Sequence, residues 1–248
     1  MVHLTKISLA FSLLFLLIFT ACEESVEEFT LPESKAYFPI EVGQMMIYQV
    51  DSINYFNGGA VVDSVRSFVR EEITERFEDV EGEEFYRLER SVRRDLADDW
   101  RIADVWLVSR DDEGVYRTEE NLRFIKLVFP LTENRTWDHN AFIDDQMFST
   151  IAGGETIQMF RNWQSSVQSL TSTQVVEGEE FNDVAVVIHV DDENVIERRY
   201  VEEQYAKGVG LIYREMMILD TQNTTSNGTW REKAEEGFIV RQQLIQRN

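Results

Sequence analysis

From residue 45 to its end, the sequence is divided into short β-type segments by turns rich in glycine, asparagine and acidic residues. Residues 45–53 alternate between apolar side chains, among them Met46 and Tyr48, and polar ones, which is the pattern of a half-buried strand. Asn57-Gly58-Gly59 then predicts a tight reversal, because asparagine and glycine adopt positive φ angles at little cost. These features predict an all-β domain of antiparallel hairpins, arranged as a curved sheet, a half-barrel or a sandwich.

The remaining strands follow from the same patterns. Residues 184–190 are nearly all apolar and predict a buried strand. Residues 61–77 carry an apolar side chain at every fourth position, which suits either one face of a strand or a stripe on a helix; their β-branched content favours a long strand. Further strands are predicted at residues 85–94, 105–109, 115–118, 122–129, 195–201, 211–219 and 237–245, with the acidic groups Asp111-Asp112-Glu113 and Asp191-Asp192-Glu193 as turns between strands.

The N-terminus carries the features of a bacterial lipoprotein signal peptide. Lys6 precedes an uncharged, apolar run at residues 7–21, which is shorter than the roughly 18–20 apolar residues that span a bilayer. The residues Phe19-Thr20-Ala21-Cys22 resemble a lipobox, although leucine is usual where Phe19 stands. The resemblance implies that residues 1–21 are removed and that Cys22 is lipidated. An ordinary cleaved signal and an uncleaved anchor are the alternatives.

Charge and cysteine content narrow the class of protein further. Cys22 is the only cysteine, so no disulfide can form within the chain, and stability must come from a packed core. The formal net charge of −22 disfavours nucleic-acid binding and indicates a soluble, self-repelling surface, with a cationic partner or divalent ions as alternatives. Residues 22–36 are acidic and predict a flexible tether, followed by a single β-rich domain at residues 37–248.

An internal repeat divides this domain. The segment Val80-Glu81-Gly82-Glu83-Glu84-Phe85 recurs unchanged at residues 176–181, and Gly114 and Gly210 follow at matching distances, each shortly before a Tyr-Arg pair. We interpret this as a duplication, with repeats at about residues 38–128 and 129–220. The alternative is that the repeated segment is a common hairpin solution in a glutamate-rich chain.

Three motifs stand out from the strand pattern: Tyr37-Phe38-Pro39-Ile40-Glu41-Val42-Gly43, Phe129-Pro130-Leu131 with Trp137 soon after, and Lys207-Gly208-Val209-Gly210-Leu211. Together they resemble an uncharacterised family of Bacteroidota outer-membrane lipoproteins. Met46 departs from the pattern, since an aromatic residue is common there, and Glu133-Asn134 replaces a glycine-containing turn. The resemblance implies a β-rich envelope lipoprotein and no known activity. The acidic residues after Cys22 also resemble a surface-export signal, which implies display on the outer membrane; attachment facing the periplasm is the alternative.

The sequence offers no catalytic motif. His139 and His189 are distant in the sequence, with no zinc-binding spacing, so no metal site and no cofactor are predicted. His189 is interpreted as a strand residue that faces a partner or solvent, and His139 as part of a polar loop. Carboxylate pairs are too abundant to nominate an acid and a base. The tryptophans Trp100, Trp106, Trp137, Trp163 and Trp230 are interpreted mainly as core residues that could also stack on a sugar.

We therefore predict a non-enzymatic envelope lipoprotein that binds a hydrophobic or glycan ligand, or a partner envelope protein, with its ligand-binding residues unknown. A carboxylate-dependent hydrolase and a structural or assembly component of an outer-membrane complex are the alternatives. An open cavity between the two repeats would favour ligand binding, whereas a filled core with an exposed aromatic patch would favour a protein partner.

Overall fold

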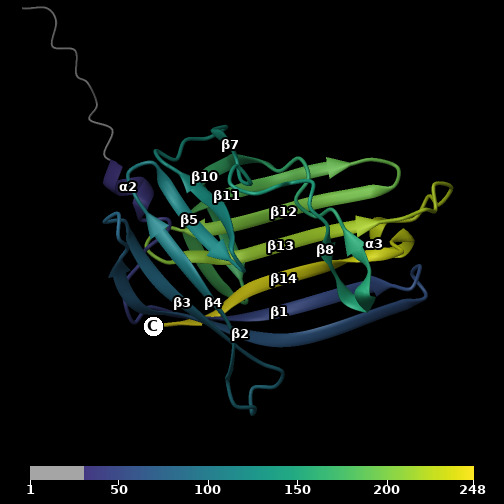
Figure 1. The fold of residues 1–248 in the computed structure, drawn as a ribbon, viewed down its shortest axis with the longest axis horizontal. Helices are drawn as coiled ribbons and strands as arrows, with labels where there is room; N and C mark the ends of the chain where they lie inside the picture. Colours follow the sequence, from purple (N-terminus) through teal and green to yellow (C-terminus); the bar gives the residue numbers. More distant parts are fainter. Residues whose placement is uncertain (1–30) are drawn as a thin grey trace, which may run out of the picture. The chain divides into compact units, whose positions relative to one another are not determined.

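A strongly curved antiparallel sheet of twelve strands dominates the computed structural model, which describes residues 31–248 (Figure 1). The first six strands are β1 (Met45–Phe56), β2 (Val61–Glu78), β3 (Glu84–Arg93), β4 (Arg101–Arg110), β5 (Gly114–Glu119) and β6 (Leu122–Val128). The other six are β7 (Thr136–Asp138), β10 (Gln164–Val176), β11 (Glu179–Glu193), β12 (Glu197–Ala206), β13 (Gly210–Asp220) and β14 (Glu236–Arg247). The predicted all-β class is confirmed.

The sheet consists of two meanders that meet at the β1–β14 pair. One side runs β1 to β6 in chain order, and the other runs β14, β13, β12, β11, β10 and β7. The two edge strands, β6 and β7, lie close together. The backbone N–H of Ile125 in β6 donates to the carbonyl of His139, directly after β7, at 3.0 Å. The indole N–H of Trp137 donates to the carbonyl of Ile125 at 2.9 Å. The sheet is therefore almost a closed barrel, with an interior lined by every second residue of each strand.

The predicted faces of β1 agree with this arrangement. Met46, Tyr48 and Val50 are buried on the inner face, while Gln49 and Asp51 are partly exposed on the outer face. Residues 61–77 lie within β2, so the strand interpretation is confirmed and the helix alternative is wrong.

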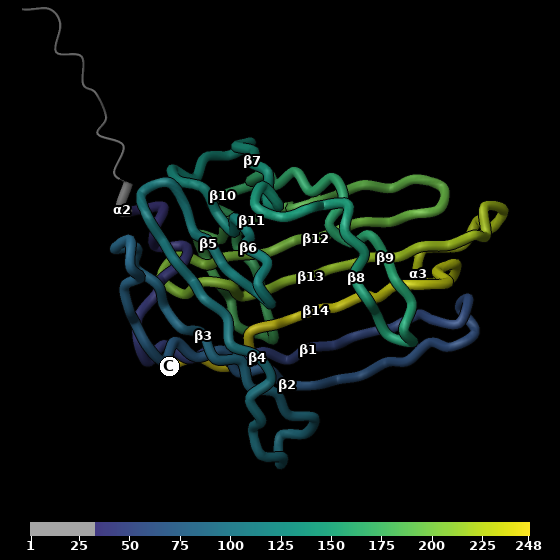
Figure 2. The backbone as a smooth tube through the Cα atoms, viewed as in Figure 1, coloured from purple at the N-terminus to yellow at the C-terminus, as the bar shows by residue number. Residues whose placement is uncertain are grey.

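A segment between β7 and β10 crosses the open half of the concave face (Figure 2). We call residues 139–163 the strap; it contains the short pair β8 (Ser149–Thr150) and β9 (Thr156–Ile157) and the 3-10 turn η2 (Ala152–Gly154). At the strap's tip, the Glu155 carboxylate accepts a 2.8 Å hydrogen bond from the backbone N–H of Asn57 in the β1–β2 turn. Ile157, Phe160 and Trp163 of the strap are buried in a core cluster with residues of β11 to β13.

Two short helices complete the described part of the chain. α3 (Trp230–Lys233) packs Trp230 on Tyr55 and Ile239 in a separate cluster. Neither helix in residues 31–248 has the length and hydropathy needed to cross a bilayer.

The folded part begins earlier than predicted. Residues 31–36 belong to the predicted tether, but α2 (Leu31–Lys35) is part of the compact unit. Ser34 is buried, and its hydroxyl accepts a 3.0 Å hydrogen bond from the backbone N–H of Leu131. This buried contact with residues of the mid-chain fixes the helix to the domain, which composition alone could not indicate.

The acidic group at residues 191–193 is also placed differently from the prediction. Asp191, Asp192 and Glu193 continue β11, and the reversal follows at residues 194–196. Asp191 forms a 2.6 Å ion pair with Arg198 on the neighbouring strand, so cross-strand charge pairing allows the acidic residues to extend the ladder. The group at residues 111–113 does form a turn: the Asp111 carboxylate accepts hydrogen bonds from the backbone N–H groups of Glu113 and Gly114.

The two copies of the repeated segment lie in corresponding hairpins, β2–β3 and β10–β11, but form different turns. In the second copy Glu177 and Gly178 both have positive φ angles and form a two-residue turn. In the first copy residues 79–83 form a longer loop, with Val80 fully exposed. The duplication itself stays a prediction, and β14 lies beyond the repeat boundary predicted at residue 220.

Candidate functional site

The interior of the barrel holds a network of charged side chains. They come from inward-facing positions on six different strands: Glu71 of β2, Arg90 of β3, Arg117 and Glu119 of β5, Lys126 of β6, Glu203 of β12 and Arg214 of β13. Positions two apart on a strand share a face, so β5 contributes both members of the Arg117–Glu119 pair. The interior is therefore not a simple apolar core, and its charges are held by long-range pairing across the sheet.

Glu203 is the centre of one end of this network. The Nζ of Lys126 lies 2.7 Å from its carboxylate, and the Nε of Arg214 lies 3.5 Å away. The Tyr205 hydroxyl also donates to it. Burial opposes ionisation of Glu203, but the cations, Lys126 foremost, hold the pKa of its carboxyl well below the usual range. Burial also lowers the pKa of Lys126 to about 8, with Glu203 opposing the shift.

Ser165, His189 and Glu203 form a hydrogen-bonded chain. The Ser165 hydroxyl lies 2.7 Å from Nδ1 of His189, and Nε2 of His189 lies 2.8 Å from the Glu203 carboxylate. Burial lowers the pKa of His189 to about 4, although Glu203 opposes this. His189 is thus neutral at pH 7, and because an ionised carboxylate only accepts, Nε2 carries the proton and Nδ1 accepts from Ser165.

This order of serine, histidine and carboxylate matches that of nucleophilic hydrolases. Here, however, Ser165, His189 and Glu203 all have zero exposure. A substrate cannot reach the Ser165 hydroxyl in this conformation. We therefore interpret the hydrogen bonds from Ser165 through His189 as interactions that orient the Glu203 carboxylate.

One of the two histidine interpretations is wrong: His189 faces the barrel interior instead of a partner or solvent. His139 lies in a turn directly after β7, as predicted, and is buried there. Their ring centroids lie 4.2 Å apart, and the His139 ring also packs on Phe124 and Trp163. The interpretation was wrong because the barrel closure between β6 and residue 139 brings these distant segments together. Within residues 31–248, no group of three or more histidine, cysteine or acidic residues has the geometry of a metal site.

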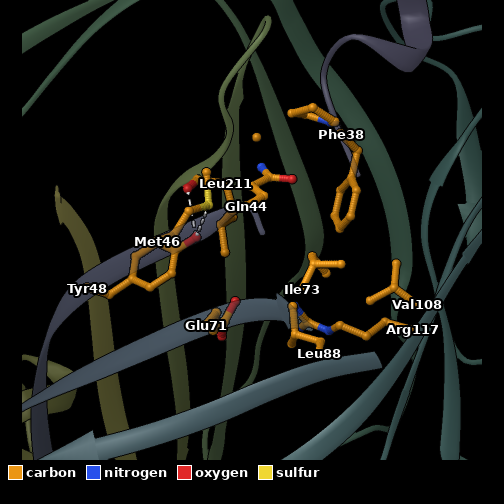
Figure 3. Close-up of a pocket in the computed structure, with 12 residues that line it drawn as sticks. Phe38, Gln44, Met46, Tyr48, Glu71, Ile73, Leu88, Val108, Arg117 and Leu211 are labelled. Carbon is orange, nitrogen blue, oxygen red and sulfur yellow. Dashed lines mark hydrogen bonds between the residues drawn. The ribbon is translucent and has the colours of Figure 1, made fainter. Parts of the chain in front are cut away.

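Two cavities lie at successive levels along the strands, with the charged network between them. We call the first the apolar cavity; it has a volume of about 50 Å³. Figure 3 shows Phe38, Ile73, Leu88 and Val108 around it. The Tyr48 hydroxyl donates a 3.1 Å hydrogen bond to the Leu211 carbonyl at its wall.

The second cavity, which we call the aromatic pocket, has a volume of about 180 Å³. It lies between the β5–β6 turn and the strap, and residues of both meanders line it. Its lining consists of Trp106, Glu119, Glu120, Leu122, Phe124, Lys126, His139, Met159, Phe160, Trp163, Arg214 and Met216. A cavity of about 150 Å³ with apolar walls can hold a benzene ring, so this pocket has room for a compound with a single ring.

Three polar atoms on residues that line the aromatic pocket have no hydrogen-bond partner within residues 31–248. They are Nε1 of Trp106 and Nδ1 of His139, on residues that are 6% and 2% exposed, and Nε of Arg214, which lies 3.5 Å from the Glu203 carboxylate. Buried polar atoms of this kind nearly always have a partner in a folded protein. Trp106 is further held between charges, with the Arg90 guanidinium 3.9 Å and the Arg117 guanidinium 4.7 Å from its ring centroid.

The other residues singled out from the sequence are distributed as follows. Trp106, Trp137, Trp163 and Trp230 are buried, as predicted, while Trp100 is partly exposed beside Arg70 and Arg93. The predicted lipidation site, Cys22, lies outside the described residues. No ligand-binding residue was predicted from the sequence, so Lys126, Glu203 and Arg214 were missed. A signal existed for Lys126 and His189, since each interrupts an apolar strand.

Comparisons with known proteins found similarity to solved structures alone. No protein-family model matches it, and no curated protein matches it. It is similar to a "putative exported protein with YmcC-like fold" from Bacteroides fragilis, at 11% identity and a TM-score of 0.37, over 85% of this chain and 98% of that one. It is also similar to a "putative lipoprotein" from Parabacteroides distasonis, at 9% identity and a TM-score of 0.34, over 86% of this chain and 98% of that one. Both scores are too low to carry a conclusion about ligand or activity.

Proposed function

We propose that this chain is a lipid-anchored envelope protein that binds one small ligand in the aromatic pocket and catalyses no reaction. The observation that carries the proposal is a cavity large enough for one ring whose lining residues Trp106 and His139 each have a buried polar atom, Nε1 and Nδ1, without a partner in residues 31–248. A ligand would supply the missing hydrogen bonds, which are costly to leave unmade in a buried site.

The composition of the walls supports a ring-shaped ligand. Phe124, Phe160 and Trp163 contribute aromatic faces, and Met159 and Met216 contribute polarisable thioethers that adapt to a ligand's shape. The pocket is bounded by both meanders, which is the arrangement that favours ligand binding over docking of a partner protein.

Location in the envelope rests on the sequence around Cys22. The proposal predicts that cells expressing the chain incorporate labelled palmitate into it, and that Cys22→Ala abolishes the label. Protease treatment of intact cells then separates surface display, in which the protein is cut, from attachment facing the periplasm, in which it is protected.

Ligand binding is tested by native mass spectrometry of residues 22–248 carrying Cys22→Ser, purified without detergent. The change leaves the whole compact unit, residues 31–248, intact. We expect extra mass that disappears on denaturation. Leu122→Trp, at the pocket, should remove that mass by filling the space. Ile102→Trp is the control, because Ile102 is 65% exposed on β4. A ligand-free mass for the unsubstituted protein, with no binding of added ring compounds, would contradict the proposal.

A further inference from the structure

Charge is distributed unevenly along the interior network. At one end, the Arg90 guanidinium lies 3.1 Å from Glu71 and 3.2 Å from Asp104, so one cation faces two carboxylates. In the middle, Arg117 and Glu119 pair with each other, with Nε and an oxygen 2.7 Å apart. These two groups leave no excess of positive charge.

The other end has the opposite balance. Glu203 lies 2.7 Å from Lys126 and 3.5 Å from Arg214, so two cations contact one carboxylate. Two further glutamates line the same pocket: Glu119 is ion-paired with Arg117, and Glu120 is exposed in the β5–β6 turn. The other ionisable neighbours of Glu203 carry no charge at pH 7. His189 is neutral at pH 7, because burial lowers its pKa to about 4, and burial raises the pKa of Tyr205 well above its ordinary value.

The two cations that share Glu203 line the aromatic pocket. On β6, Leu122, Phe124 and Lys126 lie on one face, and burial increases along this row from partly exposed Leu122 to Lys126, which is 1% exposed. The row therefore leads from an apolar opening to a cationic inner wall. The unpartnered indole N–H of Trp106 adds a neutral donor in the same pocket.

We infer that the ligand of the aromatic pocket is a small apolar ring compound bearing a carboxylate, with the ring packed against the Phe124–Phe160 pair and the carboxylate toward Lys126 and Arg214. The inference rests on the proposed function and names its ligand class. An anion compensates the unmatched cation in a buried site, where an unpaired charge is unfavourable. A guanidinium and an indole N–H both donate to carboxylate oxygens.

Titration calorimetry at pH 7 tests this with two compounds of nearly equal shape, benzoate and neutral benzamide. The protein is residues 22–248 with Cys22→Ser. We expect benzoate to bind at least tenfold more tightly than benzamide. Arg214→Gln should weaken benzoate binding about tenfold and change benzamide binding less than twofold. Arg123→Gln is the matched control, because Arg123 lies over Tyr116 and Phe142 and does not line the pocket.

These measurements test ligand binding and charge selection separately. Equal binding of benzoate and benzamide would overturn the charge selection while leaving ligand binding in place. An equal loss with Arg214→Gln and Arg123→Gln would also overturn it, because the effect would then not arise in the pocket. Binding of neither compound, together with a ligand-free native mass, would remove the proposed function itself. Circular dichroism of each variant excludes misfolding as the cause of a loss.

Discussion

The apolar cavity and the aromatic pocket share walls on β4, β5 and β13, yet they differ in their fitness to receive a ligand. The apolar cavity, at about 50 Å³, holds at most one or two water molecules, and its Tyr48 hydroxyl is already hydrogen-bonded to the Leu211 carbonyl. The aromatic pocket is larger, at about 180 Å³, and its Trp106 and His139 retain polar atoms without partners. Arg117, at the wall of the apolar cavity, also has a nitrogen without a hydrogen bond, Nη2, but this nitrogen is ion-paired with Glu119. Neutral polar atoms without a partner within residues 31–248 therefore distinguish the aromatic pocket from the apolar cavity.

The charged network that separates the two cavities explains the difference. On β5, Arg117 lines the apolar cavity and Glu119 lines the aromatic pocket. The Arg117–Glu119 ion pair thus separates the two cavities, while Lys126 and Arg214, both beside Glu203, add two cations to the wall of the pocket. Removing the charge of Glu203, or titrating the groups around it, should therefore affect the aromatic pocket.

Glu203→Gln should have the largest effect. The substitution leaves Lys126 and Arg214 buried without a carboxylate, and breaking a buried ion pair on one side costs about 3–5 kcal/mol of unfolding free energy. Urea unfolding at pH 7 measures the loss. Glu202→Gln is the matched control: Glu202 is the adjacent residue on β12, partly exposed and hydrogen-bonded to Tyr200 and Gln204. Equal destabilisation by the two variants would contradict a special role for Glu203.

Acid should destabilise the domain through its buried histidines. Burial lowers the pKa of His189 from 6.5 to about 4 and that of His139 well below 6.5. Between those values the unfolded chain binds protons that the folded one does not, so stability falls as the pH decreases from about 6.5 to 4. His189 alone accounts for a loss of about 3 kcal/mol.

Urea unfolding of the wild type and of His189→Gln, at several pH values between 7 and 4, measures this slope. The variant cannot take up the proton, so its stability should depend less steeply on pH. Identical slopes in the two proteins would show that His189 does not cause the acid sensitivity.

Benzoate binding should weaken at alkaline pH, by a smaller free energy. Burial lowers the pKa of Lys126 to about 8, so raising the pH from 7 to 9 removes the charge of Lys126 while benzoate stays ionised. We expect affinity to fall by up to about tenfold, or about 1.4 kcal/mol. Calorimetry across this range measures it, with benzamide as the neutral control. A flat profile for benzoate would place its carboxylate away from Lys126.

The strand pattern could be predicted from the sequence because it depends on local periodicity. Residues close together in the chain determine three of the correct predictions: the turn at Asn57, the face of β1 that carries Tyr48, and the identity of β2 as a strand. The helix at residues 31–35 could not, because its place depends on the contact between Ser34 and Leu131, which are far apart in the sequence.

The candidate site could not be predicted for the same reason. Glu203 is one of 46 acidic residues, and nothing near it in the sequence distinguishes it from Glu202. Its role follows from the register of β12 and from closure of the barrel, which bring Lys126 to it across 77 positions. His189 did interrupt an apolar strand, and a buried polar side chain in such a position indicates a partner elsewhere in the fold.

Filling the apolar cavity should have the smallest effect and is the sharpest test of the comparison. Val108→Ile adds one methylene beside about 50 Å³ of empty space, so we expect a change in unfolding free energy within about 1 kcal/mol, with the sign set by how well the side chain fits. Val108 lies two residues from Trp106 on β4, on the same inner face, so the variant changes one cavity and leaves the wall of the other. Benzoate affinity at pH 7 should therefore stay within twofold of the wild-type value. A loss of binding as large as that expected for Arg214→Gln would mean that the two cavities respond as one, and that the ligand site extends across the charged network.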